Sequence, residues 1–335
     1  MSTLYPRAME LDQYIRNRIQ ELTRAYNATV ATMYSAVLQN IRNAQRFNRQ
    51  SAVNALILKF NNDVARLRQQ LAFEIQRVQN HVPSDFEVAP VQRKRALLIG
   101  INYLNTPYAL AGCIDDAKRM QTFLEDKKFS CQVLTDETTQ KPTKATILSL
   151  FAQMLASAQA GDLLFFYFSG HGSYTYDRNG DEADKRDEMI VSSDLQGVLD
   201  DELKALLSKH LKEGVTLVGL FDSCHSGTMF DLKYSYLDGA NCDSYIENSK
   251  VSECAGNVLM ISGCMDAQTS AEAIIDSRPQ GAMSWSFLEL LKDHPSLSWR
   301  ELLKGMRDIL KTNQFTQVPS LSTDSFYDID QPMFV

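Results

Sequence analysis

The sequence predicts an α/β protein whose mostly parallel sheet has helices on both faces and follows a separate α-helical region. From residue 93 onward, short apolar runs such as 163–168 (LLFFYF) and 215–221 (VTLVGLF) alternate with helical stretches. Apolar runs without polar alternation are typical of parallel strands buried on both faces. Residues 1–82 instead have heptad-like apolar spacing, with no Gly or Pro between Pro6 and Pro83. That pattern indicates long helices.

The composition is that of a soluble globular protein. Of the 335 residues, 44% are hydrophobic and 22% charged, a length that suggests about two domains. No apolar run approaches the roughly 20 residues of a membrane helix, and the N-terminus lacks a signal-peptide pattern. The six cysteines include no CxxC pair, which disfavours a disulfide framework or a zinc site. We therefore expect reduced thiols, a cytoplasmic location and no membrane partner.

The charge is unevenly distributed along the chain. Residues 1–82 contain ten Arg and one Lys against five acids, a net charge of +6, so the remainder carries −13. An acidic body disfavours nucleic acid as a partner. We predict an N-terminal helical region at 1–82, a linker with two prolines at 83–92, and an α/β domain at 93–335.

The heptad pattern of the N-terminal region changes phase near residues 48–51. Ser51 could cap a second helix. A two-helix hairpin is therefore preferred to a single helix of about 110 Å. The hairpin could pack on itself or on the body, or it could mediate self-association or dock a partner, and the pattern does not decide between these. The Arg-rich start is also typical of a transit peptide, but its length and its acids Glu10, Asp12 and Glu21 argue against that interpretation.

The α/β domain is predicted to contain at least five strands and five helices. The strands are expected at 95–101, 129–134, 163–168, 215–221 and 257–262, and the helices at 115–127, 143–158, 200–212, 282–292 and 298–311. Thr143 is a plausible cap for its helix. Active sites in such sheets lie beyond the carboxyl ends of the strands.

Two of the predicted strands end in motifs that can carry chemistry. Strand 163–168 is followed by Ser-Gly-His-Gly and strand 215–221 by Asp-Ser-Cys-His-Ser-Gly. If these strands are neighbours, about 4.8 Å apart, then His171 and Cys224 converge at one edge of the sheet. An imidazole lowers the pKa of a nearby thiol and later protonates the leaving amine. The N–H groups of Gly172 and Cys224 are candidate donors to an oxyanion.

Simpler explanations exist for each residue alone. A lone Cys is usually a small buried hydrophobe, and a lone His after a strand is usually an ordinary loop residue. Here both residues follow strands beside glycines, which favours a joint catalytic role. Adjacent residues in an extended turn point to opposite sides, so His171 is preferred to His225 as the base.

These motifs resemble those of caspase-like cysteine proteases and, within them, the metacaspases. The motifs are SGHG (169–172) and DSCHSG (222–227), 53 residues apart from His171 to Cys224, near the roughly 50 typical of that clan. The QACxG motif of true caspases is absent. Segments 111–117, 180–184, 199–202 and 262–271 also match. The resemblance covers about 93–335, implies a caspase-like fold in a type I-like arrangement, and gives no information on residues 1–82.

The resemblance implies a nucleophilic Cys224, a general acid/base His171, and cleavage of protein substrates after Arg or Lys. The chemistry of the site agrees, because carboxylates of Asp116 and Asp222 at one edge would attract a cation. The family pocket adds Cys113 and Ser169 as lining residues. Asp116 could instead stabilise its own helix N-terminus, and Asp222 could simply hold the turn.

The resemblance also implies an activating Ca²⁺ ion. The acid-rich stretch 177–188 is not an EF-hand, because Gly180 is at its fourth position rather than its sixth. Metacaspase-like calcium ligands correspond to four acids here: Asp187, Asp200, Asp201 and Asp231. A divalent ion would relieve their mutual repulsion and order the loops around Cys224. Zinc would instead inhibit, because it favours the thiolate and the imidazole.

A protease selective for basic residues could cleave itself. The candidate sites in predicted exposed loops are Lys185, Arg186, Lys233 and Lys250; Arg278 precedes a proline and is disfavoured. The leading hypothesis is a calcium-dependent cysteine endopeptidase. Its rivals are a scaffold or proteostasis protein that assembles through residues 1–82, with secondary protease activity, and a different cysteine hydrolase or transferase.

Overall fold

The computed structural model describes most of the chain. The described residues are 4–46, 50–80, 92–176, 186–223, 227–236, 246–248, 250–263, 272–275, 278–294, 296–325, 327, 329–330 and 333. The chain divides into two compact units, residues 1–90 and 91–335. Within the described ranges, no helix has both the length and the hydropathy required to cross a bilayer.

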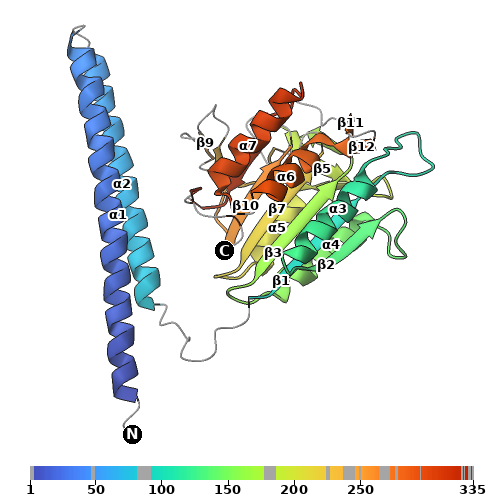
Figure 1. Cartoon of the computed structure of the whole chain (residues 1–335), viewed down its shortest axis with the longest axis horizontal. Helices are drawn as coiled ribbons and strands as arrows, with labels where there is room; N and C mark the ends of the chain where they lie inside the picture. Colours follow the sequence, from blue (N-terminus) through green and yellow to red (C-terminus); the bar gives the residue numbers. More distant parts are fainter. Residues whose placement is uncertain are drawn as a thin grey trace. The chain divides into compact units, whose positions relative to one another are not determined.

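The first unit is a pair of long helices, α1 (Leu4–Arg46) and α2 (Gln50–Asn80), which lie side by side (Figure 1). Tyr34 of α1 contacts Phe60 of α2, with ring centroids 5.9 Å apart. Ser51 lies inside α2, so its predicted capping role is wrong: the helix begins one residue earlier. Among the described side chains of this unit, only Val53 is buried. Two helices alone cannot enclose a core, because each has only one neighbour.

The second unit is built on an eight-stranded sheet in the order β2-β1-β3-β7-β10-β13-β8-β9. The first five strands in this order are parallel, and β13 runs antiparallel to both β10 and β8. The strands are β1 (Lys94–Gly100), β2 (Ser130–Thr135), β3 (Leu163–Ser169), β7 (Thr216–Asp222), β8 (Tyr234–Tyr236), β9 (Ile246–Glu247), β10 (Asn257–Ser262) and β13 (Ser320–Thr323).

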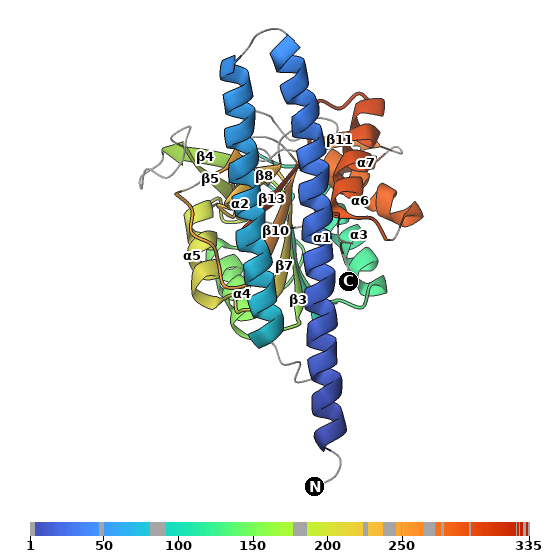
Figure 2. The same cartoon turned by 90° about the vertical axis from the view of Figure 1, so that its left-hand side faces the viewer.

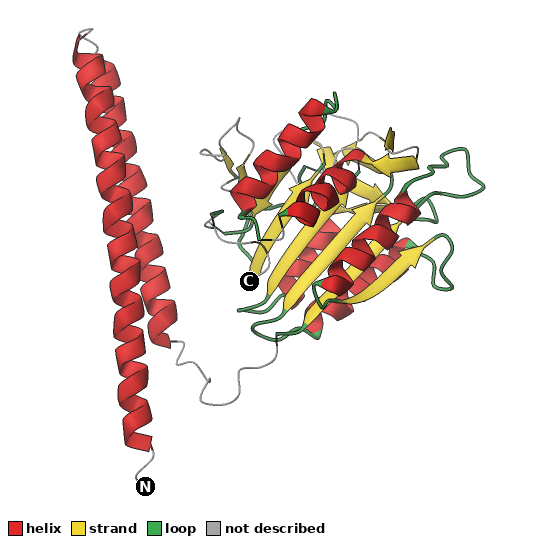
Figure 3. Ribbon diagram, in the orientation of Figure 1, coloured by secondary structure: helices red, strands yellow, loops and turns green. Residues whose placement is uncertain are grey.

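Helices cover both faces of this sheet (Figures 2 and 3). One face packs against α3 (Cys113–Asp126), α6 (Ala282–Asp293) and α7 (Trp299–Thr312), and the other against α4 (Lys144–Ala156) and α5 (Asp200–His210). The predicted architecture, a mostly parallel sheet with helices on both faces that follows an N-terminal helical region, is confirmed.

The central strand β3 shows why its sequence has no polar alternation. Leu163, Phe165 and Tyr167 face the core beneath α3, α6 and α7, whereas Leu164, Phe166 and Phe168 face the core beneath α4 and α5. All six side chains are buried. Because both faces are covered, each successive residue of the strand must be apolar.

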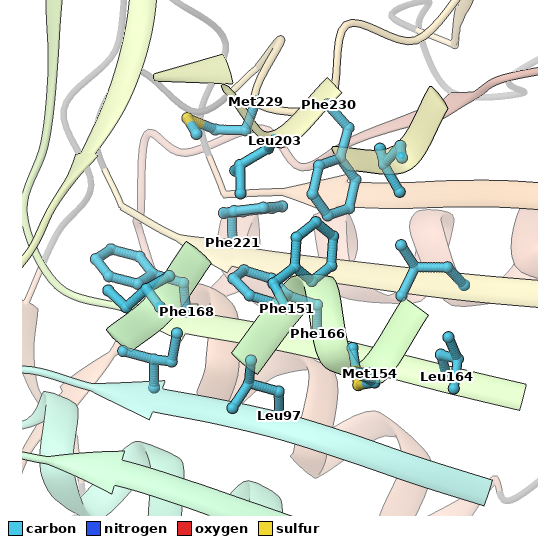
Figure 4. Close-up of a cluster of buried hydrophobic side chains, with 14 of the residues drawn as sticks. Leu97, Phe151, Met154, Leu164, Phe166, Phe168, Leu203, Phe221, Met229 and Phe230 are labelled. Atoms are coloured by element: carbon cyan, nitrogen blue, oxygen red, sulfur yellow. The ribbon is translucent and has the colours of Figure 1, made fainter. Parts of the chain in front are cut away.

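Aromatic side chains fill the core beneath α4 and α5 (Figure 4). The Phe151 and Phe166 ring centroids are 4.9 Å apart, and those of Phe221 and Phe230 are 5.0 Å apart. A side chain at Gly219 of β7 would overlap the Phe230 ring, so the glycine allows Phe230 to pack directly on the strand. This packing fixes the chain segment just before Asp231.

Helix boundaries agree closely with the sequence. Thr143 caps α4 by accepting a hydrogen bond from the Thr146 N–H (3.2 Å), and Ser298 caps α7 in a capping box with Glu301. The sequence did not predict the short antiparallel elements: β4 (Gly172–Tyr176), β5 (Arg186–Val191) and β6 (Gly197–Leu199) in one sheet, and the β11 (Glu272–Ile275) and β12 (Arg278–Gly281) pair. It also missed β8, β9 and β13.

Candidate active site

The site lies at the carboxyl ends of β3 and β7, which are parallel neighbours. Their last paired residues are Ser169 and Asp222. The Gly170 N–H lies 3.4 Å from the Asp222 carbonyl oxygen, so the two chains stay adjacent past the strand ends. His171 comes two residues after Ser169, and Cys224 comes two residues after Asp222.

Some predicted residues lie outside the described part of the chain. These are Cys224, His225 and Lys185. Arg186 begins β5, opposite Tyr176 of β4. Gly172 begins β4 directly after His171 and is half-buried.

The backbone and the ring of His171 are both held by hydrogen bonds. Its backbone N–H donates to the Tyr103 hydroxyl (2.8 Å), and that hydroxyl donates to the Val191 carbonyl oxygen (2.7 Å). The Nε2 atom of the His171 ring is 2.7 Å from the Tyr108 carbonyl oxygen. A carbonyl can only accept a hydrogen bond, so the neutral ring carries its proton on Nε2. The Nδ1 atom is then the nitrogen available as a base.

Tyr103 is itself fixed in an unusual backbone conformation. Its φ of 51° lies in the left-handed region, which non-glycine residues seldom occupy. Asp136 Oδ2 accepts the N–H groups of Tyr103 (3.1 Å) and Asn102 (2.5 Å). The Tyr103 ring is buried, with its centroid 4.6 Å from that of His171. Residues 102–103 therefore set the position of His171, a role that the sequence alone did not reveal.

The two predicted pocket acids meet at the N-terminus of α6. Asp116 Oδ2 accepts the Gly281 N–H and Asp222 Oδ2 accepts the Ser284 N–H, both at 2.8 Å. Both carboxyl groups are buried. A side chain at Gly281 would overlap Asp222 Oδ2 and crowd Asp116, so glycine is required for the close approach. Helix N-termini favour negative charge, and this arrangement keeps two buried acids together.

The simpler roles expected for these acids, a charge at its own helix N-terminus for Asp116 and support of the turn for Asp222, are only partly right. Asp116 does lie in the first turn of α3, but its oxygens bond to Gly281 of α6 and to the Arg119 guanidinium. Asp222 does fix the chain at the end of its strand, because its carboxylate accepts the Ser284 N–H. Burial and then the nearby charge of Asp222 raise the pKa of Asp116 to about 7. The pocket therefore changes charge near neutral pH.

The hydroxyl of Tyr167 lies in the same buried region. It is 2.6 Å from Ser284 Oγ and also hydrogen-bonds Ser169. Burial, followed by the charges of Asp116 and Asp222, raises the pKa of Tyr167 well above its ordinary value. Cys113, the first residue of α3, is buried as well. The structure thus brings Asp116, Ser169 and Asp222 together, and places Cys113 on the helix that carries Asp116.

Three of the four predicted calcium ligands form one cluster. Oxygen atoms of Asp200, Asp201 and Asp231 all lie within 4.8 Å of one another. Because Ca²⁺–oxygen distances are about 2.3–2.6 Å, two ligands of one ion lie up to roughly 5 Å apart. The carboxylate oxygens of this cluster therefore fit the size and the hard-ligand preference of Ca²⁺.

Asp187, the fourth predicted ligand, is not among those three. It is buried on β5, and the N–H of the next residue, Glu188, donates to Asp200 Oδ2 (2.7 Å). Asp200 Oδ1 accepts the Asp201 N–H (2.8 Å). Backbone donors of β5 and α5 therefore hold the Asp200 carboxylate, and the β5 donor comes from the residue after Asp187.

The predicted self-cleavage residues differ in accessibility. Lys250 is exposed in a turn. The side chain of Lys233 is only 22% exposed, and its ammonium pairs with Glu253 (2.8 Å). The expectation that Lys233 lies in an exposed loop is therefore wrong.

Comparison with known proteins agrees with this architecture. The family model described as the metacaspase, peptidase C14 domain matches residues 94–233. This range contains the predicted catalytic, pocket and calcium-ligand residues, but not Gly281, Ser284 or Lys250. A solved structure of a protein from Geobacter sulfurreducens has a TM-score of 0.55 and 24% sequence identity, covering 72% of this chain and 98% of that one. That similarity concerns the fold alone.

Named relatives match over a longer stretch. Metacaspase-1A of Neurospora crassa is 35% identical over 71% of this chain, and the match spans 64% of its own length, less than two thirds. Metacaspase-1B of Aspergillus fumigatus is 34% identical, covering 77% of this chain and 76% of its own. Metacaspase-3 of Trypanosoma brucei brucei is 37% identical, covering 72% and 74%. These matches place the chain among proteins that have a peptidase C14 domain. Within that class, this chain belongs to the metacaspase family.

Proposed function

We propose that the chain is a calcium-activated cysteine endopeptidase that cleaves protein substrates after Arg or Lys. The observation that carries the proposal is the pairing of the two strand ends, Ser169 with Asp222, because in the sequence His171 and Cys224 each follow this pair by two residues. A thiol and an imidazole that follow the same pair of strand residues by an equal number of residues are well placed to act together.

The catalytic steps follow from the properties of these groups. His171 Nδ1 takes the thiol proton of Cys224, and the thiolate sulfur attacks the scissile carbonyl carbon. The N–H groups of Gly172 and Cys224 would stabilise the oxyanion. His171 then gives its proton to the leaving amine as the peptide bond breaks, which leaves a thioester. Water, deprotonated by His171, releases the carboxylic acid and restores the thiol.

The preference for a basic residue is supported by Asp116 and Asp222. Two neighbouring buried carboxyl groups attract a guanidinium or an ammonium and repel a substrate Asp. Asp116 already pairs with the Arg119 guanidinium of its own helix, a contact of the same kind as the one proposed for the substrate. Ser169 and Cys113 would line the same pocket.

Calcium would be held by Asp200, Asp201 and Asp231, with Asp187 as a further candidate. The ion supplies positive charge that offsets the repulsion between these carboxylates and fixes the segment after Cys224 that carries Asp231. Self-cleavage is proposed at Lys250, since this is the described candidate side chain that is exposed. Lys185 and Arg186 remain candidates from the sequence.

The helical unit supports a second proposal, self-association or scaffolding. Its described side chains include one buried residue, while Tyr34, Leu58 and Phe73 are more than half exposed. A helix pair without a core gains stability when a further helical surface covers it. Sedimentation of the full chain and of a chain lacking residues 1–82 tests this proposal: a change of oligomeric state supports it, and identical states contradict it.

Cleavage of two matched peptides tests the enzymatic proposal. The peptides differ only in carrying Arg or Asp before the scissile bond, and each is assayed with calcium or with a chelator. The proposal expects cleavage of the Arg peptide with calcium and loss of cleavage in the Cys224→Ala variant. Equal turnover of both peptides would contradict the basic specificity, and turnover by Cys224→Ala would contradict the nucleophile.

A further inference from the structure

Asp231, one of the three clustered carboxylates, has a strained backbone. Its φ is 44°, in the left-handed region, which costs energy for a residue other than glycine. Its N–H donates to the Thr228 carbonyl oxygen (2.6 Å), which closes a turn. Such a conformation persists only when surrounding contacts hold it.

Lys204 makes a contact that holds this backbone. Its Nζ donates to the Asp231 carbonyl oxygen (2.8 Å). Lys204 lies one helical turn after Asp200 on α5, so it emerges on the same side of the helix as that ligand. One helix therefore supplies two acids of the cluster and the donor that fixes the third.

A lysine so close to a proposed cation site would by itself repel the ion. Here Lys204 Nζ also bonds Asp324 Oδ1 (3.0 Å). The Lys204 side chain is 14% exposed and that of Asp324 is fully buried. The carboxylate thus neutralises the ammonium and leaves its N–H donors free to hold Asp231.

Asp324 is in turn fixed by the main sheet. It follows β13, its N–H donates to the Val258 carbonyl oxygen of β10 (3.0 Å), and its Oδ2 accepts the Cys254 N–H. The position of Asp231 is therefore tied to the inner strands β10 and β13 of the main sheet through the Lys204–Asp324 ion pair.

We infer that Lys204 and Asp324 are positioning residues for the cation site, holding Asp231 in its ligand conformation without placing a net charge beside the ion. This inference rests on the proposed calcium site. If the pair served only to connect α5 to β13, a variant with normal folding stability would bind calcium as tightly as the parent.

Calcium titration by calorimetry, with thermal unfolding alongside, separates these roles. The full chain carries Cys224→Ala, so that no sample is lost to self-cleavage. Lys204→Met is expected to weaken calcium binding about ten-fold or more, as outer residues of metal sites do. Lys209→Met, an exposed lysine on the same helix, is the matched control and should bind calcium like the parent.

The double variant Lys204→Met with Asp324→Asn is decisive. It removes both charges, so the thermal stability lost in Lys204→Met should return, while calcium binding stays weak because nothing holds Asp231. Recovery of both properties, or parent-like binding by a folded Lys204→Met, would overturn the inference. If the parent binds no calcium, or binds it equally well after Asp231→Asn, the calcium site itself fails and the inference with it.

Discussion

Ser169 and Asp222 face each other on the last rung of the parallel ladder between β3 and β7. Both are buried, and both belong to the region around the Tyr167 hydroxyl. This pair of residues therefore has two roles. It provides two residues of the proposed pocket, and it gives the chains leading to His171 and Cys224 a common starting point.

Replacing the proposed nucleophile should abolish turnover. Cys224→Ala is expected to lower kcat by about 1,000-fold or more, because no other group can form the thioester. Cys131→Ala, at a half-buried thiol on β2, is the control and should retain activity. The measurement is peptidase turnover of an Arg peptide. Equal losses in both variants would indicate a folding defect instead of a nucleophile.

Removing the Tyr103 hydroxyl should impair catalysis more than substrate binding. Tyr103→Phe keeps the ring against His171 but removes the acceptor for the His171 N–H and the donor to Val191. Since the base is then less well placed, kcat should fall about ten-fold with KM nearly unchanged. Tyr176→Phe, at an 87% exposed side chain, should match wild type. A change confined to KM would contradict the assigned role.

Neutralising one pocket acid should change specificity. Asp222→Asn is expected to raise KM for an Arg peptide about ten-fold or more, because a buried charge-assisted contact is lost. Asp115, an exposed acid next to Asp116 in the first turn of α3, provides a contrast: Asp115→Asn should have no effect. Steady-state kinetics on Arg and Lys peptides check both. An unchanged KM in Asp222→Asn would remove this residue from the pocket.

Binding of a basic peptide should strengthen as pH rises through 7. The pKa of Asp116 is about 7, so the fraction of charged carboxylate grows between about pH 6 and about pH 8, while a guanidinium stays charged throughout. Titration of Cys224→Ala with an Arg peptide isolates binding from chemistry. Affinity should rise several-fold over this range, and Asp116→Asn should flatten the profile.

The same carboxyl should affect stability in the opposite direction. Its folded pKa exceeds its unfolded value of 3.8, so the folded state binds the proton more strongly. Stability contributed by this group is present below pH 4 and falls as pH rises toward 7. Asp116→Asn should remove this slope from the pH dependence of thermal unfolding. A steeper slope in the variant would contradict the assigned pKa.

Chelation should silence the peptidase reversibly. With the ion removed, repulsion among the clustered acids should disorder the segment after Cys224, and calcium should restore turnover. Asp200→Asn or Asp231→Asn should raise the calcium concentration for half activation about ten-fold, and Glu213→Gln, at an exposed acid elsewhere, should not. Activity that persists fully in chelator would contradict the calcium requirement.

The sequence predicted the central part of this architecture because buried parallel strands have a distinct pattern. All five predicted strands and all five predicted helices were found within two residues of their boundaries. The short antiparallel strands escaped, since β6, β8 and β13 have three or four residues each. Segments this short show no clear period.

The site was predictable only where a motif follows a strand. The pocket acids and the Asp200–Asp201 pair could be proposed from their places at the sheet edge, but their partners could not. Gly281 and Ser284 lie 165 and 62 residues from the acids that they contact. Tyr103 lies 68 residues before His171, and Lys204 resembles an ordinary surface residue on a helix. The glycine just before the predicted helix 282–292 was the one available signal for an acid-binding helix terminus.

The most direct test of the whole account is covalent labelling with an arginine-containing peptide that carries a thiol-reactive electrophile, followed by mass spectrometric mapping. We expect modification at Cys224 alone, strongly slowed in His171→Ala and absent with an otherwise identical aspartate peptide. Modification of a different cysteine, or equal labelling by the two peptides, would contradict the proposed pairing of thiol, imidazole and acidic pocket.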